Sequence, residues 1–210
     1  MPYTALLTAL HSLSQEGFTS DQRDALRALC EYLEEPSPYA LFLLTGYAGT
    51  GKTFLLRTIT DLALQSGLRV ELMASTGRAA KVLSASTGRP ASTVHRTIYR
   101  ASMQMQEEGG SFQLGRVSAT TPTLFIVDEA SMIAGDTGEV SPFGSGNLLD
   151  DLLSYVWSAE DAKLIFVGDT AQLPPVGTSL SDALNAEILT SRYGLHVYGM
   201  ELCEVVRQKR

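Results

Sequence analysis

Short runs of apolar and β-branched residues alternate along this chain with longer stretches in which apolar residues recur every three or four positions. The short runs predict strands, and they fall at residues 40–45, 69–74, 123–127 and 163–167. The longer stretches predict amphipathic helices, and they fall at residues 19–35, 51–66, from about residue 76 onward, and 148–157. This alternation predicts an α/β fold, with a mainly parallel sheet flanked by helices.

Two segments interrupt the alternation. Residues 102–118 alternate weakly around a Gly-Gly pair, which predicts a small inserted β-hairpin. Residues 135–146 are rich in Gly, Ser and Pro and predict a loop before the last of these helices. A length of 210 residues without an internal repeat favours one domain over residues 1–210.

Composition narrows the class of protein. A chain with 44% apolar and 19% charged residues lies in the globular range. Its net charge of -7 argues against a surface that holds nucleic acid by bulk positive charge, so any such contact must be local. Because no apolar run reaches the roughly 18 to 20 residues needed to cross a bilayer, we expect no membrane association and a cytoplasmic location.

The segment GYAGTGKT at residues 46–53 fits the phosphate-loop pattern G-x-x-x-x-G-K-[ST]. It follows a predicted strand and opens a predicted helix, so backbone N–H groups would converge on phosphate groups. Lys52 would neutralise the β- and γ-phosphates, and the Thr53 hydroxyl would ligate Mg²⁺. The alternative, a plain Gly-rich turn, is disfavoured by the full pattern and both flanking elements. The nucleotide-contacting residues expected here are Gly46, Ala48, Gly49, Thr50, Gly51, Lys52, Thr53 and Phe54.

An acidic pair follows the predicted strand at residues 123–127, in the segment LFIVDEAS. Taken alone, such a pair is more often a solvated loop or a charge at a helix N-terminus. With a phosphate loop in the same chain, the favoured interpretation is a division of labour. Asp128 would hold the Mg²⁺ shell, and Glu129 would orient and deprotonate the attacking water as general base.

The predicted strand at residues 163–167 runs directly into GDTAQLPPVG. Gln172 is suited to hydrogen-bond a γ-phosphate or its attacking water, and would act there as a catalytic residue. Gln172 could then report the nucleotide state to whatever is touched by this loop, which Pro174 and Pro175 stiffen. An ordinary strand-to-loop exit is the alternative, and the segment alone does not decide between the two.

These segments together resemble the N-terminal motor domain of superfamily 1B helicases, the RecD-like and Dda-like group that moves 5′ to 3′ on single-stranded DNA. The resemblance rests on an ordered set of motifs that begins at about Phe18 and spans nearly the whole chain: GFTSDQRDAL, GYAGTGKT, ASTGRAAKVL with STVHR, IVDEASM, FVGDTAQLPPVG and EVVRQ. The phosphate loop alone would not single out this family, whereas the ordered set is highly specific. It implies a RecA-like P-loop NTPase fold, ATP and Mg²⁺ as cofactors, and single-stranded DNA as partner.

The resemblance also implies roles for individual residues. Gln22 matches the family's adenine-reading glutamine, since its amide can donate and accept at the adenine edge; otherwise it would be surface filler. Arg207 in EVVRQ matches the arginine finger, which stabilises charge on the transferring phosphoryl group. His95 is as readily a packing histidine as a DNA contact. The DNA-contacting residues expected are Thr76, Gly77, Arg78, Ala79, Thr93, His95 and Pro174.

A helicase of this class also needs a second RecA-like domain, C-terminal to this one, which closes over the nucleotide and grips the DNA. Nothing within residues 1–210 supplies it, so we expect a fragment of a longer protein or a degenerate form, with weak ATP hydrolysis and little unwinding by this chain alone. The predicted hairpin lies where the family carries its strand-separating pin. Phe112 or Met105 could wedge the duplex fork there, and a plain surface ribbon is the equal alternative.

Two other classes of function stay open. A nucleotide-dependent switch that docks a protein partner without nucleic acid would suit the acidic surface, and it would tolerate the loss of Thr76 and Arg78. A small-molecule P-loop kinase is disfavoured, because Gln172 suits phosphate sensing and no compact acceptor-binding lid is apparent.

Overall fold

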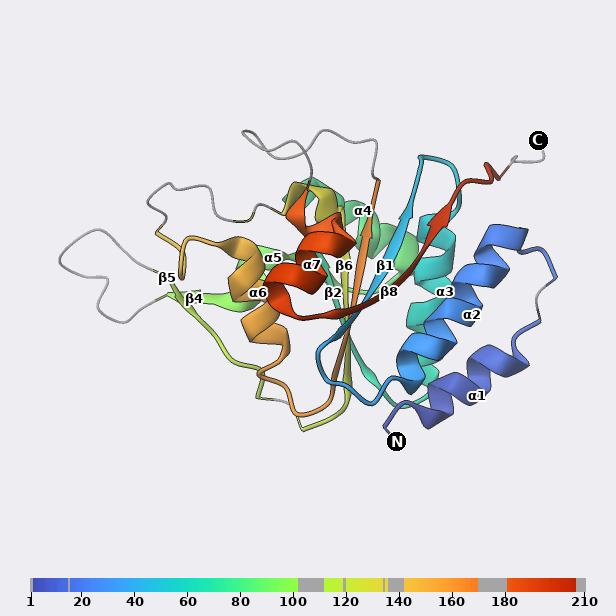
Figure 1. Cartoon of the computed structure of the whole chain (residues 1–210), viewed down its shortest axis with the longest axis horizontal. Helices are drawn as coiled ribbons and strands as arrows, with labels where there is room; N and C mark the ends of the chain where they lie inside the picture. The colour runs from blue at the N-terminus through green and yellow to red at the C-terminus, as the bar shows by residue number, and fades with distance from the viewer. Residues whose placement is uncertain are drawn as a thin grey trace.

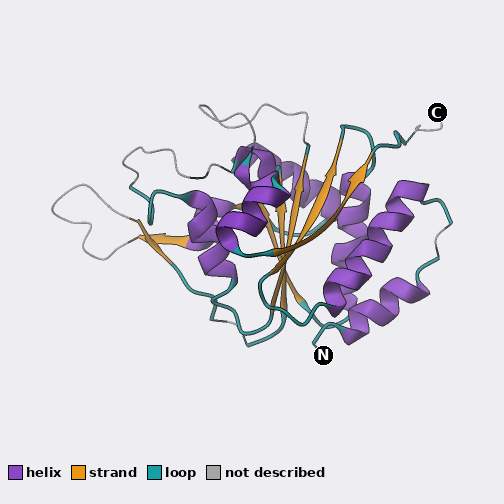
Figure 2. Ribbon diagram, in the orientation of Figure 1, coloured by secondary structure: helices purple, strands orange, loops and turns teal. Residues whose placement is uncertain are grey.

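The computed structural model describes residues 2–14, 16–101, 112–118, 120–133, 135, 142–169 and 181–206. Within them, a six-stranded sheet in the order β3-β2-β6-β7-β1-β8 forms the centre of the molecule, and every neighbouring pair of its strands is parallel. Helices cover both faces of this sheet (Figures 1 and 2). The predicted α/β fold with a mainly parallel sheet flanked by helices is therefore confirmed.

The strands of this sheet are β1 (Ala40–Gly46), β2 (Arg69–Ala74), β3 (Ala91–Thr93), β6 (Thr123–Asp128), β7 (Ala162–Gly168) and β8 (His196–Leu202). The α-helices are α1 (Thr4–Ser12), α2 (Ser20–Glu34), α3 (Lys52–Gln65), α4 (Gly77–Thr87), α5 (Val94–Ile98), α6 (Leu148–Val156) and α7 (Ala186–Tyr193). Two short 3-10 helices are η1 (Ala130–Met132) and η2 (Asp182–Leu184). In the part of the chain that the structure describes, no helix has both the length and the apolar character needed to span a membrane.

The sheet separates two hydrophobic cores. Successive side chains of a strand point to opposite faces, so Phe42 and Leu44 of β1 pack in the core that α1, α2 and α3 cover, on one side of the sheet. Leu41 and Leu43 pack in the core that α5, α6 and α7 cover, on the other side (Figure 1). Because β1, β6 and β7 are buried on both faces, their sequences are apolar almost without interruption, which explains why they were predictable.

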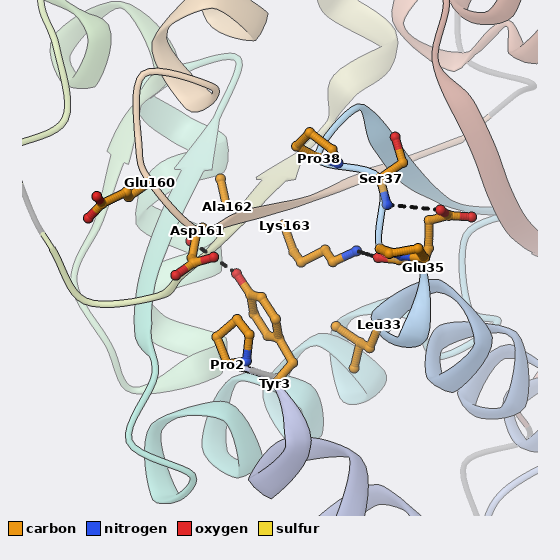
Figure 3. Close-up of a pocket in the computed structure, with 11 residues that line it drawn as sticks. Pro2, Tyr3, Leu33, Glu35, Ser37, Pro38, Glu160, Asp161, Ala162 and Lys163 are labelled. Carbon is orange, nitrogen blue, oxygen red and sulfur yellow. Dashed lines mark hydrogen bonds between the residues drawn. The ribbon is translucent and has the colours of Figure 1, made fainter.

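Helix α2 is fixed at both of its ends. At its N-terminus the Thr19 hydroxyl accepts from the Gln22 amide and the Gln22 side chain accepts from the Thr19 amide, which forms a capping box. At its C-terminus, Lys163 of β7 donates from Nζ to the carbonyl oxygens of Tyr32 at 3.1 Å and of Glu35 at 2.8 Å, and Figure 3 shows the second of these bonds. Burial lowers the pKa of Lys163, and the Glu35 carboxylate opposes this shift.

A cavity of about 250 Å³ adjoins Lys163 at the edge of the sheet where β6 and β7 begin (Figure 3). The hydroxyl of Tyr3 donates here to the carbonyl oxygens of Thr123 at 3.0 Å and of Asp161 at 3.2 Å. Burial raises the pKa of the Tyr3 phenol, and the Asp161 carboxylate adds to this shift. These bonds hold the N-terminal segment against the sheet. The polar groups around this cavity therefore serve to join α1, α2 and the sheet.

A separate antiparallel pair, β4 (Tyr99–Ala101) and β5 (Phe112–Leu114), corrects the bounds expected for the inserted hairpin. Its first strand begins upstream of the predicted range 102–118. Residues 102–111 lie outside the described residues, so the rest of the predicted hairpin stays a prediction.

The predicted loop at residues 135–146 is described at residue 135 and at 142–146, where the chain forms a bridge to β5. The Phe112 amide donates to the carbonyl oxygen of Pro142 at 2.8 Å, and the Gly144 amide donates to that of Phe112 at 2.9 Å. The rings of Phe112 and Phe143 stack with centroids 4.7 Å apart. The base of the small sheet is therefore anchored to the segment that precedes α6.

The periodicity of the sequence does not reveal α1, β3, α5, α7 or β8. β3 and α5 have three and five residues, which is too short for a periodic pattern. β8 is the edge strand beside β1, and most of its residues are at least partly exposed. Its sequence therefore lacks the continuous apolar run that marks the central strands.

Candidate nucleotide-binding site

The phosphate loop leaves the carboxyl end of β1 and enters α3. Gly46, Gly49 and Gly51 have φ angles of 150°, 84° and 89°, which residues with a side chain rarely adopt. A Cβ atom at Gly51 would lie 2.3 Å from Nε2 of Gln22, and one at Gly46 would lie 2.5 Å from the carbonyl oxygen of Leu202. The compact path of this loop therefore requires glycine at both positions.

The ammonium group of Lys52 lies against this loop. Its Nζ donates to the carbonyl oxygens of Gly46 at 2.5 Å and Tyr47 at 2.9 Å. Burial lowers the pKa of Lys52, whereas the carboxylates of Asp169 and Asp128 act in the opposite direction. Lys52 thus lies between the phosphate loop and two acids at the ends of other strands.

The register of the sheet brings these acids to the loop. Thr45 of β1 pairs with Gly168 of β7, and Val127 of β6 pairs with Phe166 of β7. The three strands therefore end at the same edge of the sheet, where adjacent strands are about 4.8 Å apart. β7 lies between β6 and β1, so Asp128, the last residue of β6, lies two strands away from the strand that leads into the phosphate loop.

The acidic pair is held in two different environments. Burial raises the pKa of Asp128, and both the Glu129 amide and the Lys52 ammonium oppose this shift. Burial also raises the pKa of Glu129, the Asp128 charge adds to the shift, and Arg78 opposes it. The positive charge that acts on Asp128 is therefore that of the phosphate-loop lysine, whereas the one that acts on Glu129 is that of Arg78 on α4.

Glu129 has a φ of 52°, and among the described residues it is the only non-glycine with a positive φ. This left-handed conformation costs roughly 1–2 kcal/mol for a residue with a side chain. The 2.9 Å hydrogen bond from the Glu129 amide to Oδ1 of Asp128 accompanies it. Strain of this kind concentrates at functional sites, and here it sets the direction of the chain immediately after β6.

A cavity of about 740 Å³ opens beside the loop and is within the size range of small-molecule sites. It is lined by Gly17, Gln22, Ala48, Gly49, Gly51, Lys52, Thr53, Phe54 and Val206. Most of these residues were predicted to contact nucleotide. Two further predicted residues support the loop instead of lining the cavity: Gly46 is buried at the end of β1, and the Thr50 hydroxyl donates to the carbonyl oxygen of Tyr47 at 2.8 Å.

Gln22 is buried, so the alternative that it is surface filler is wrong. Its Nε2 donates to the carbonyl oxygen of Thr50 at 3.1 Å, and its Oε1 accepts from the Thr19 amide at 3.1 Å. A side-chain amide has two donor hydrogens and two acceptor lone pairs, so each end keeps capacity for a ligand. Gln22 therefore ties α2 to the phosphate loop and lines the cavity, and adenine reading stays a prediction.

The threonines expected at the DNA-binding surface begin two neighbouring helices. Thr76 accepts from the Ala79 amide at 3.1 Å as the N-cap of α4, and Thr93 accepts from the Arg96 amide at 3.2 Å as the N-cap of α5. Ala74 of β2 pairs with Thr93 of β3, which places both caps at the same edge of the sheet. The two motifs are thus brought together, and each hydroxyl keeps a hydrogen with which it can donate to a phosphate.

The same region is locally basic. Between Glu71 and Glu107 the sequence contains no acidic residue, and its basic residues are Arg78, Lys81, Arg89, Arg96 and Arg100. The overall net charge of -7 hides this local excess of positive charge. A nucleic-acid contact here does not conflict with an acidic chain, because phosphate binding depends on local Lys and Arg.

His95 is half-buried between two aromatic rings, with centroids 5.7 Å from that of Tyr99 and 5.2 Å from that of Phe143. Burial lowers the pKa of its imidazole. Two roles were considered for His95. The packing role is observed, and the DNA contact stays a prediction.

Several residues singled out in the sequence lie outside the described residues: Met105, Gln172, Pro174, Pro175 and Arg207. Phe112, the other candidate wedge, is stacked on Phe143 at the base of the small sheet. This packing favours a role for Phe112 in anchoring that base over one in opening a duplex.

Asp169 is a site residue to which the sequence interpretation gave no role. It comes directly after β7, at the same edge of the sheet at which Asp128 ends β6, and its charge acts on Lys52. The position of an acid directly after a predicted buried strand was the signal that could have identified it.

A phosphate loop at the end of β1, acids at the ends of β6 and β7, and a parallel sheet between two helical layers define a P-loop NTPase domain of the RecA-like type. The chain belongs to the AAA domain family, which it matches over residues 17–210.

Individual relatives narrow the group further. The chain is 38% identical over 148 residues to the ATP-dependent RecD2 DNA helicase of Deinococcus radiodurans, a match that covers 70% of this chain and 18% of that protein. It is 28% identical over 196 residues to the ATP-dependent DNA helicase dda of Enterobacteria phage T4, a match that covers 91% of this chain and 40% of that protein. The structure of Pif1 helicase from Candida albicans has the same fold, with a TM-score of 0.54 and 23% identity over 91% of this chain and 41% of that one. The resemblance to superfamily 1B helicases is confirmed, and the chain spans less than half the length of these relatives.

Proposed function

We propose that this chain is the ATP-hydrolysing motor domain of a 5′ to 3′ helicase that acts on single-stranded DNA. The observation that carries the proposal is the position of Lys52, which bonds the phosphate loop and lies near the carboxylates of Asp128 and Asp169. A lysine between phosphate-binding amides and a metal-binding acid is the arrangement that P-loop NTPases use.

The groups in the cavity fit a nucleoside triphosphate with Mg²⁺. The Thr53 hydroxyl and the Asp128 carboxylate are oxygen ligands of the kind that Mg²⁺ prefers, and when bound the ion would neutralise charge on the β- and γ-phosphates. Gln22 would bond the adenine edge with the donor and acceptor capacity that its internal bonds leave free. Phe54, which lines the cavity and is exposed, would pack against the base.

Glu129 is the proposed general base. It would accept the proton of the attacking water, and burial together with the Asp128 charge makes it a stronger base than an ordinary carboxylate because both raise its pKa. Gln172 would orient the same water, and Arg207 would stabilise charge on the transferring phosphoryl group; these two roles rest on the helicase resemblance.

Single-stranded DNA is proposed to lie across the caps of α4 and α5. The N-terminus of α4, with Thr76, Gly77 and Ala79, can bind a backbone phosphate, and Arg78 adds a positive charge beside it. A second RecA-like domain, C-terminal to this one in the full-length protein, would close over the nucleotide and grip the DNA further along. The solved Bacteroides Pif1 helicase in complex with ADP-AlF3 and single-stranded DNA is a longer chain, of which this chain covers 43%.

The test compares ATP hydrolysis with and without an oligothymidylate strand, on this chain and on a protein extended to include the following domain. Arg78→Ala should weaken DNA binding severalfold. It should also reduce the slope of log affinity against log salt concentration by about one, because one fewer phosphate is neutralised. Arg57→Ala is the matched control, because Arg57 is an exposed arginine on α3. If the extended protein neither binds the strand nor hydrolyses ATP faster with it, the helicase proposal is wrong and a nucleotide-dependent protein switch becomes the better interpretation.

A further inference from the structure

The segment that follows β8 runs past the N-terminus of α2 and reaches the phosphate loop. The amides of Cys203 and Glu204 both donate to Oδ2 of Asp21, at 2.7 Å and 2.8 Å. The amide of Val206 donates to the carbonyl oxygen of Gly49 at 2.9 Å. One end of this short segment is thus bound to α2 and the other end to the phosphate loop.

These backbone bonds decide where the segment lies, because its side chains bury little surface. Residues 203–206 are all exposed, with Val205 at 64% and Val206 at 42%. The hydrophobic effect therefore contributes little to the position of these residues. A carboxylate that accepts two amide hydrogens forms charge-assisted bonds, which are stronger than those between neutral groups. Ser20 adds a side-chain bond, since its hydroxyl donates to the Glu204 carboxylate.

Asp21 belongs to a helix that cannot easily shift. The capping box fixes the N-terminus of α2, and Nε2 of Gln22 bonds the phosphate loop. Lys163 bonds the carbonyl oxygens of Tyr32 in the last turn of the helix and of Glu35, which follows it; Figure 3 shows the bond to Glu35. Because α2 is held in place, the carboxylate of Asp21 is a fixed hydrogen-bond acceptor for the segment at residues 203–206.

That segment supplies part of the cavity wall. Val206 lines the cavity, and its Cγ2 lies 3.3 Å from the point where a Cβ atom of Gly51 would be. We propose that Asp21 is a positioning residue of the nucleotide site: it holds residues 203–206 against the phosphate loop so that Val206 closes one side of the cavity. The inference rests on the proposed nucleotide-binding function. It gives Asp21, which is not among the residues that line the cavity, control over nucleotide affinity.

The test measures the binding of a fluorescent, non-hydrolysable ATP analogue to three variants of the whole chain. Asp21→Ala removes the acceptor and should weaken binding about tenfold, because the wall at Val206 is no longer fixed. Asp21→Asn keeps an oxygen of the same reach and should stay within about threefold of the unmodified protein. Asp24→Ala is the control, since Asp24 is an acid on the same helix that bonds only Arg27 among the described residues and should leave affinity unchanged.

Hydrogen exchange gives a second readout that needs no variant. The amides of Cys203 and Glu204 should exchange slowly although their side chains are exposed, and the nucleotide analogue should slow exchange at Val206 further. Fast exchange at Cys203 and Glu204, or equal affinities of Asp21→Ala and Asp24→Ala, would overturn the inference.

Lys52→Ala separates this inference from the proposed function. If Lys52→Ala abolishes analogue binding while Asp21→Ala leaves it intact, the nucleotide site stands and the role of Asp21 fails. If Lys52→Ala binds the analogue as well as the unmodified chain does, the nucleotide site itself fails, and the role of Asp21 fails with it.

Discussion

The amide of Glu129 donates a 2.9 Å hydrogen bond to the carboxylate of Asp128, and the chain turns into a left-handed conformation at the same point. Two residues adjacent in sequence are thereby given different neighbours, Lys52 for Asp128 and Arg78 for Glu129. The separation matches a division of labour in which one acid binds the metal ion and the other activates water.

Glu129→Gln should abolish turnover and preserve nucleotide binding. The amide cannot accept a proton from water, and the loss of a general base costs about a hundredfold or more in rate. Single-turnover hydrolysis and analogue affinity, measured on the same preparation, check this expectation. A variant that still hydrolyses ATP at the unmodified rate would remove Glu129 from the chemistry.

Gly51→Ala should destabilise the fold and also abolish nucleotide binding. Gly51 has a φ of 89°, and its new methyl group would lie 2.3 Å from Nε2 of Gln22. Gly67→Ala is the matched control, because Gly67 has a φ of 79° but nothing within 4 Å of the added atom. The control should therefore lose only the roughly 1–2 kcal/mol of backbone strain, with affinity unchanged. Denaturant unfolding and analogue binding measure the two effects, and equal behaviour of the two variants would show that the contact with Gln22 is unimportant.

The rate of hydrolysis should fall on both sides of neutral pH. Glu129 acts only when deprotonated, and its pKa is raised by burial and by Asp128, so kcat/KM should decline as pH falls through a value above that of an ordinary glutamate. Lys52 acts only when protonated, and burial lowers its pKa. The decline of the rate on the alkaline side should therefore begin at a lower pH than the titration of an ordinary lysine would give.

A charge variant tests the assignment of the acid limb. Arg78 opposes the rise in the pKa of Glu129, so Arg78→Gln should move the acid limb of the pH profile to higher pH. Lys81→Gln removes a charge from the same helix and serves as the control. An acid limb that stays in place, or that moves to lower pH, would contradict the role given to Glu129.

The sequence predicted the centre of the molecule well because the physical causes there are local. β1 is an uninterrupted apolar strand, and the glycines of GYAGTGKT occupy positions where a Cβ atom has no room or the backbone has positive φ. Asp128 is the last residue of an equally apolar strand, and Glu129 follows it directly. Parallel strands that are buried on both faces also imply that their functional ends meet at one edge.

The features that escaped prediction depend on distant contacts or on single backbone angles. Asp21 and Cys203 are 182 positions apart, and no local sequence pattern predicts the hydrogen bond between them. The left-handed angle at Glu129 has no sequence signal, because glutamate is not a residue that favours it. β8 pairs with β1 at the edge of the sheet, and because most of its residues are at least partly exposed, its sequence shows no clear alternation of buried and exposed positions.

Lys52 is the residue on which the proposed nucleotide site depends most, and the affinity and turnover of a Lys52→Ala variant test that site directly. The side chain bonds the phosphate loop and is half-buried near two carboxylates, so its loss should weaken binding of the ATP analogue at least about tenfold and reduce hydrolysis at least about a hundredfold. Gln65→Ala, at the far end of the same helix, should leave both quantities unchanged. A Lys52→Ala protein with full affinity and full turnover would contradict the central claim that this loop binds a nucleoside triphosphate.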